Sequence, residues 1–205
     1  DIVVRRSLFM PVNRSVPDVA QKRKDWNGLI SGFKASDLVF LDESGCNTDM
    51  TRRYAYSLGG NRAVDSAPLS KPKNTTILSS IRLDGTLRYT TFSGGTTVER
   101  FKRYLETDLL PHLNGNSVLI MDNMKSHHAK AVKELLDSSG VRYIYLPPYS
   151  PDLNPIEKLW SKVKAFLRKF KARTLDALPN AIQNAFHSVT VSDCSGWFRF
   201  CGYAL

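Results

Sequence analysis

The sequence lacks several features that would place the chain in other structural classes. Its three cysteines form no C-x-x-C pair, which argues against a disulfide framework and against a cysteine-bound zinc site. No apolar run approaches the roughly 20 residues that span a membrane, and no secretory segment opens the chain. Repeats and low-complexity segments are also missing. We therefore expect the 205 residues to form one soluble, intracellular domain with additions at its ends.

The sequence also contains few acidic residues relative to basic ones. The chain carries 19 Asp and Glu against 29 Lys and Arg, which gives a net charge of +10. Such an excess favours a polyanionic partner, and nucleic acid fits better than a membrane because no segment resembles an interfacial anchor. The alternative is a basic, soluble protein whose charge serves no partner.

Hydrophobic patterning predicts strands and helices in alternation. Apolar runs predict strands at 38–41, 75–83, 86–92, 118–121 and 141–146, with a further candidate at 52–58. Helical spacing of apolar residues predicts helices at about 17–33, 96–110, 126–138, 155–171 and 175–189. Asp84-Gly85 predicts a two-residue hairpin turn. This order predicts an α/β fold in which helices flank both faces of a mixed sheet.

The most informative stretch covers residues 146–171, where a proline-rich loop leads into a basic amphipathic helix. Asn154 can cap this helix, and Pro155 suits its first position because proline needs no amide partner there. Glu157 follows in the first turn. It is either half of a capping box with Asn154 or a carboxylate that a rigid helix start presents to a ligand.

Two aspartates, Asp42 and Asp122, each follow an apolar strand. Each could be a turn residue. If the two strands are parallel neighbours, however, both carboxylates meet at the sheet edge where α/β proteins bind ligands. Glu43 is excluded because strand side chains alternate between faces. Together with Glu157, the two aspartates would favour Mg²⁺ or Mn²⁺, and two such ions would serve phosphodiester chemistry.

Three motifs carry a family resemblance. The segments LVFLDESG around Asp42, MDNMKSHHAKAV around Asp122 and YLPPYSPDLNPIEKLW around Glu157 resemble those of the mariner-related bacterial insertion-sequence transposases. Thirty-four residues separate Asp122 from Glu157, the interval typical of this DDE group. The similarity runs through most of residues 17–203.

The resemblance implies a ribonuclease-H-like fold with a mixed, five-stranded sheet. Asp42, Asp122 and Glu157 would be the catalytic, metal-binding triad. We accordingly expect a linker and N-terminal helix at 1–34, the DDE catalytic domain at 35–190, and an aromatic tail packed on it at 191–205. The implied activity is metal-dependent cleavage at transposon ends and strand transfer into target DNA, usually at TA. It would proceed in a self-associated transpososome, in the cytoplasm at the bacterial nucleoid.

Members of this family usually carry helix-turn-helix modules ahead of the catalytic domain, and we expect this chain to match the catalytic half alone. The alternative to an enzyme is a catalytically silent DNA-binding remnant or an inhibitor of a full-length transposase. A carboxylate-pair glycosidase would gain nothing from the positive charge.

Supporting residues have two interpretations each. Asn123, Ser126, His127 and His128 could touch the substrate or orient Asp122, but we favour local capping and turn roles. Trp160 and Trp197 are predicted to be core residues. Candidate phosphate contacts, each of which could equally be an ordinary solvated residue, are Arg52, Arg53, Lys71, Lys73, Lys158, Lys162 and Lys164.

Overall fold

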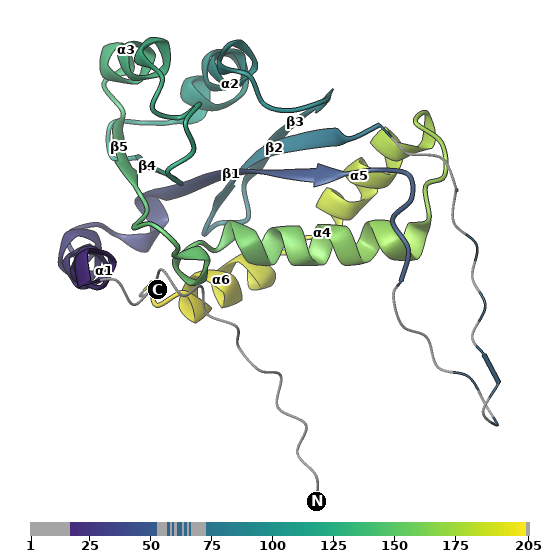
Figure 1. The fold of residues 1–205 in the computed structure, drawn as a ribbon. Coiled ribbons are helices and arrows are strands. Elements are labelled where there is room, and N and C mark those ends of the chain that lie inside the picture. Colours follow the sequence, from purple (N-terminus) through teal and green to yellow (C-terminus); the bar gives the residue numbers. More distant parts are fainter. Residues whose placement is uncertain are drawn as a thin grey trace, which may run out of the picture.

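The computed structural model describes residues 17–52 and 73–203, together with residues 57, 59, 61, 62, 64 and 66 (Figure 1). The strands are β1 (Leu38–Cys46), β2 (Thr75–Arg82), β3 (Leu87–Ser93), β4 (Val118–Met121) and β5 (Arg142–Tyr145). The helices are α1 (Pro17–Ile30), α2 (Val98–Tyr104), α3 (Lys130–Ser139), α4 (Ile156–Phe170), α5 (Ala177–His187) and α6 (Val191–Phe200). Within these residues, no helix is both long and apolar enough to cross a bilayer. The candidate strand at 52–58 falls mostly outside the described residues.

The five strands form one mixed sheet in the order β3-β2-β1-β4-β5. β1, β4 and β5 run parallel, while β2 pairs antiparallel with both β1 and β3. All four residues of β4 are buried, as expected for a central strand covered on both faces. The predicted mixed five-stranded sheet is therefore confirmed.

β1 extends further than the sequence predicted. Its parallel pairing with β4 stops at Leu41 opposite Met121, whereas its antiparallel pairing with β2 continues to Cys46. Asp42 thus lies inside β1 rather than after it, because β2 supplies hydrogen-bond partners beyond the point where β4 ends. It is nevertheless the first residue past the parallel pairing, and so it still lies beside the end of β4.

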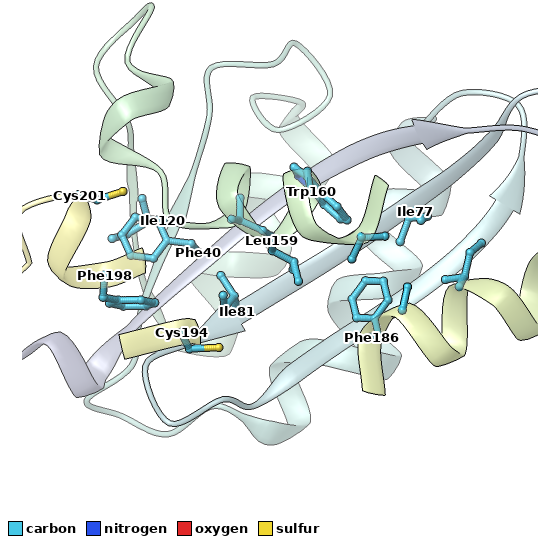
Figure 2. Close-up of a cluster of buried hydrophobic side chains, with 14 of the residues drawn as sticks. Phe40, Ile77, Ile81, Ile120, Leu159, Trp160, Phe186, Cys194, Phe198 and Cys201 are labelled. Carbon is cyan, nitrogen blue, oxygen red and sulfur yellow. The ribbon is translucent and has the colours of Figure 1, made fainter. Parts of the chain in front are cut away.

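Helices cover both faces of the sheet, and each face has its own core. β1 alternates between them: Phe40 packs toward α4, α5 and α6, while Leu41 packs toward α2 and α3. The first core, between the sheet and α4–α6, is shown in Figure 2 and includes Phe40, Ile77, Ile81, Ile120, Leu159, Trp160, Phe186 and Phe198. The second includes Val39, Leu41, Leu119, Met121, Phe101, Leu105, Val132 and Leu136.

The segment after residue 190 is a helix. A capping box starts α6, since the Thr190 hydroxyl accepts from the Asp193 amide while the Asp193 carboxylate accepts from the Thr190 amide. Phe198 is fully buried and meets Phe40 edge-on, with ring centroids 5.4 Å apart. Burial of such a side chain is worth about 1.5–3 kcal/mol. The expected aromatic tail is therefore a regular element of the first core.

Two local predictions need correction. The hairpin at Asp84-Gly85 has a three-residue loop, not two, because the Gly85 amide donates to the Arg82 carbonyl and Gly85 takes a left-handed φ of 86°. α3 begins at Lys130, four residues after the predicted start, because residues 123–129 form a loop tied to Asp122. Its predicted end at Gly140 is confirmed by a φ of 70°.

Candidate active site

The three predicted carboxylates line one cavity of about 450 Å³. The cavity lies where the parallel pairing of β1 and β4 ends, and the proline-rich loop closes its other side. Tyr149, half exposed on that loop, holds a φ of 56°, which is unusual for a residue other than glycine. The lining residues are Asp42, Asp122, Asn123, Met124, Leu146, Pro147, Pro148, Tyr149, Ser150, Pro151, Asn154 and Glu157.

Asp42 is the buried carboxylate of the site, with 8% of its surface exposed. Its Oδ1 accepts from the Glu43 amide at 2.7 Å, and its Oδ2 accepts from Nε1 of Trp160 at 3.1 Å. Burial raises the pKa of Asp42 to about 7, and the charges of Glu157 and Asp122 add to the rise. Trp160 is buried in the core, as predicted, but its hydrogen bond to Asp42 was not foreseen.

Asp122 lies in the loop after β4, and 44% of its side chain is exposed. Its Oδ1 accepts two hydrogen bonds, from the Met124 amide at 3.0 Å and from Nδ1 of His127 at 2.8 Å. Partial burial by itself would raise the pKa of Asp122, but the hydrogen bond and charge of His127 outweigh it, so the pKa is lowered. Asp122 is therefore held as a carboxylate.

His127 is fully buried and stacks on Phe101, with ring centroids 4.3 Å apart. Its Nε2 lies 3.5 Å from Oε2 of Glu43, a charge contact longer than an ordinary hydrogen bond. Burial alone would lower the pKa of His127, but Asp122 and Glu43 raise it to about 9. His127 keeps the local turn role that we favoured, since its amide donates to the Met124 carbonyl at 3.0 Å, and its ring contact with Asp122 also supports the alternative that it orients this carboxylate.

Other residues after Asp122 also fix its loop. The side-chain amide of Asn123 donates to the Leu146 carbonyl, which ties the loop to the proline-rich segment. The ring of His128 stacks on Tyr145, with centroids 4.0 Å apart. Glu43 points away from Asp42, as its exclusion from the site assumed, since it faces His127 while Asp42 faces Trp160 of α4.

Glu157 stands in the first turn of α4, but the capping interpretation fails. The helix start has no side-chain cap, and the buried Oδ1 of Asn154 has no hydrogen-bond partner among the described residues. The Asn154 carbonyl accepts from the Glu157 amide at 3.2 Å instead. The Glu157 side chain reaches solvent. Partial burial in the cavity nevertheless raises the pKa of Glu157, and the charge of Asp122 raises it further, whereas the charge of Lys164 lowers it.

The donors around the cavity suit a hard divalent cation, because all three charged groups are carboxylates. The described residues contain no group of three or more His, Cys, Asp or Glu side chains that already converge as a metal cluster. The carboxylates nevertheless repel one another across the cavity, since the charges of Glu157 and Asp122 help to raise the pKa of Asp42 and the charge of Asp122 helps to raise that of Glu157. A bound cation would relieve this repulsion.

The candidate phosphate contacts differ in their surroundings. Lys162 pairs with Asp193 at 2.5 Å, and Nζ of Lys158 lies 3.8 Å from the ring centre of Phe200, so both help to dock α6. Lys164 lines a second cavity of about 360 Å³ together with Arg168. Arg52 and Lys73 are exposed. Arg53 and Lys71 lie outside the described residues.

Comparison with known proteins identifies a matching family and two related transposases. The family model for the DDE superfamily endonucleases matches residues 37–179. The Tc1 transposase of Caenorhabditis elegans is 29% identical over 97 residues, which cover 45% of this chain and 36% of that protein. The Tcb2 transposase of Caenorhabditis briggsae is 32% identical over 75 residues, which cover 37% of this chain and 28% of that protein. The match spans about a third of the length of these two relatives.

Solved structures share the fold. The Mos1 transposase in its paired-end complex with the left transposon end has a TM-score of 0.80 at 17% identity, covering 97% of this chain and 63% of that one. The separate catalytic domain of the Mos1 mariner transposase has a TM-score of 0.67 at 16% identity, covering 93% and 91%. The predicted ribonuclease-H-like fold is therefore confirmed.

Proposed function

Because this chain belongs to the DDE superfamily endonucleases, we propose that it is the catalytic domain of a DNA transposase. In this proposal it hydrolyses phosphodiester bonds at transposon ends and joins the freed strand to target DNA, at TA dinucleotides. The observation that carries the proposal is the gathering of Asp42, Asp122 and Glu157 around one cavity, although the sequence separates them widely. The catalytic unit would span residues 35–190, with 191–203 packed on it.

Asp42, Asp122 and Glu157 are the residues that would hold Mg²⁺ or Mn²⁺, two ions in the full site. When bound, such ions activate the attacking oxygen and stabilise the leaving oxygen. Support comes from the all-carboxylate donor set and from the Mos1 paired-end complexes, which were solved with Mg and with Mn. Trp160 and His127 hold two of the carboxylates in place.

The net charge of the chain supports DNA as the proposed substrate. A net charge of +10 favours a phosphate backbone. Among the described residues, Lys164, Arg52 and Lys73 are the candidate contacts that neither pair with a carboxylate, as Lys162 does, nor lie on an aromatic ring, as Lys158 does. The Mos1 complexes contain paired transposon ends, so the proposal includes self-association in a transpososome. It places the activity at the DNA of a bacterial cell.

A catalytically silent DNA-binding remnant or inhibitor is the second candidate. It would keep the fold and the charge while losing the carboxylates, whereas all three carboxylates line the cavity here. The two functions therefore differ in a single measurable property, which is metal-dependent cutting of DNA.

Glu157→Gln tests the proposal. A neutral amide is a poor ligand for a hard cation, so we expect the variant to fold normally and to lose nicking of supercoiled plasmid DNA in Mg²⁺ or Mn²⁺. Glu134→Gln is the matched control, because Glu134 is exposed on α3 outside the cavity and should retain nicking. Full nicking by a folded Glu157→Gln chain would exclude the metal role. An inactive wild-type chain that still binds DNA would favour the remnant.

A further inference from the structure

One buried imidazole links two carboxylates, one on β1 and one in the loop that follows β4. Nδ1 of His127 lies 2.8 Å from Oδ1 of Asp122, and Nε2 lies 3.5 Å from Oε2 of Glu43. His127 itself is completely buried. Neither the predicted triad nor the family match assigns a role to His127 or Glu43.

Asp122 needs such a partner because the sheet does not hold it. β4 ends at Met121, and the following residues form a loop. Oδ1 of Asp122 accepts from the Met124 amide as well as from His127, whereas Oδ2 accepts no hydrogen bond from any described residue. The carboxylate is thus fixed by one oxygen and leaves the other available for a ligand.

The imidazole is in turn fixed on its far side. Oε2 of Glu43 and Nε2 of His127 are both buried, and neither makes a regular hydrogen bond with a described residue, so each is the other's charge partner. Phe101 covers the ring by stacking. Because Glu43 is on β1 and is paired with β2, this contact anchors the loop of Asp122 to the centre of the sheet.

We propose that His127 is the positioning residue of the metal site: it orients Asp122 toward the divalent ion, and Glu43 of β1 anchors the imidazole through its other ring nitrogen. The inference rests on the proposed function in that Asp122 binds the ion. Partners of this kind around metal-binding carboxylates typically change metal affinity or activity by about 10- to 100-fold when they are removed.

Two substitutions separate positioning from packing. In His127→Asn the amide nitrogen takes the place of Nδ1 and can still donate to Asp122, while the contact with Glu43 is lost. In His127→Gln the amide reaches toward the place of Nε2, so the contact with Glu43 is kept and the bond to Asp122 is lost. Both variants lose the ring stacked on Phe101, and both should show a similar loss of thermal stability by circular dichroism.

The readout is Mn²⁺ affinity without DNA, measured from the electron paramagnetic resonance signal of free Mn²⁺. We expect His127→Gln to bind Mn²⁺ at least about 10-fold more weakly than wild type, and His127→Asn to stay within about threefold. Equal affinities in the two variants would overturn the proposal. If neither variant folds, Glu43→Gln decides: a severalfold weaker affinity supports the proposal, and an unchanged affinity overturns it.

The same measurements keep this inference apart from the proposed function. A wild-type chain that cuts DNA while both His127 variants bind Mn²⁺ equally would defeat only the positioning role. A chain that shows the expected Asn and Gln difference in Mn²⁺ binding but never cuts DNA would defeat only the transposase proposal. A wild-type chain that binds no Mn²⁺ would defeat both.

Discussion

Asp42 and Asp122 are the same residue type and both follow the last pair of the parallel strands β1 and β4, yet their surroundings differ. Asp42 is buried within a strand, and its pKa is raised to about 7. Asp122 is half exposed in a loop, and its pKa is lowered. Burial raises the pKa of Asp42, and the hydrogen bond from the neutral indole of Trp160 only partly opposes the rise. The hydrogen bond and charge of the His127 imidazole instead overcome the partial burial of Asp122 and lower its pKa.

The comparison shows how one cavity can keep like charges close together. If all three carboxylates were fully ionised, their repulsion would have to be offset by other groups. Here burial raises the pKa of Asp42 to about 7, so that Asp42 is partly protonated near neutral pH, while His127 lowers the pKa of Asp122 and keeps it charged. A bound cation can then displace the proton from Asp42, so cation affinity should rise with pH near 7.

The largest effect is expected when the charge of either aspartate is removed. Asp42→Asn and Asp122→Asn each take away an ionic ligand, and a metal ion supplies several kcal/mol of transition-state stabilisation. We expect each variant to lose about a thousandfold in the rate of metal-dependent plasmid nicking, which corresponds to about 4 kcal/mol. A tenfold loss or less in either variant would show that its carboxylate is not a ligand.

The stability of the same two variants should change in opposite directions. Because the pKa of Asp42 is raised from 3.8 to about 7, its stabilising contribution is present at acid pH and lost as pH rises through 7. Asp42→Asn should therefore increase the free energy of unfolding at pH 8, by up to about 4 kcal/mol, and less at pH 5. Because the pKa of Asp122 is lowered, its contribution is present at neutral pH and lost in acid.

Asp122→Asn should accordingly decrease the free energy of unfolding at pH 8, by about 1–3 kcal/mol, because buried His127 loses its charged partner. Urea unfolding of both variants without divalent ions measures the two changes. Changes of the same sign in the two variants would contradict the assignment of opposite pKa shifts.

Trp160→Phe tests the surroundings of Asp42 alone, because it removes the indole N–H donor and leaves both aspartates in place. Oδ2 of Asp42 then loses its hydrogen bond from Nε1, which should cost about 1–3 kcal/mol of stability and raise the pKa of Asp42 further. The pH profile of metal-dependent nicking should move to higher pH. Trp197→Phe is the control. Trp197 belongs to α6, packs against the first core and does not line the cavity, so its substitution should leave the pH profile of nicking unchanged.

The smallest effect concerns Lys162 and Lys164 on α4. Lys164→Ala should reduce the slope of log affinity for DNA against log salt by about one, because one phosphate contact is lost. Lys162→Ala should leave the slope unchanged and cost at most about 1 kcal/mol of stability, since Lys162 pairs with Asp193. Equal slopes for the two variants would show that Lys164 does not contact the DNA backbone.

Local patterns predicted most elements because they depend on neighbours in sequence. The apolar run at 118–121, the hairpin at Asp84-Gly85 and the stop at Gly140 are all found. The length of β1 was missed because it depends on pairing with β2, which is far away in the chain. The helical nature of α6 was missed although Thr190 and Asp193 carry its capping signal.

The sequence by itself determined the candidate carboxylates, the mixed sheet and the basic character of the chain, because residue type and spacing encode strand ends, helix starts and charge. Only the tertiary structure decided that Asp42 binds Trp160, that His127 joins Asp122 to Glu43, and that Lys162 is paired with Asp193. These contacts form between side chains that the fold brings together in space. Local spacing carries no information about such pairs, and these pairs fix the orientation of each group.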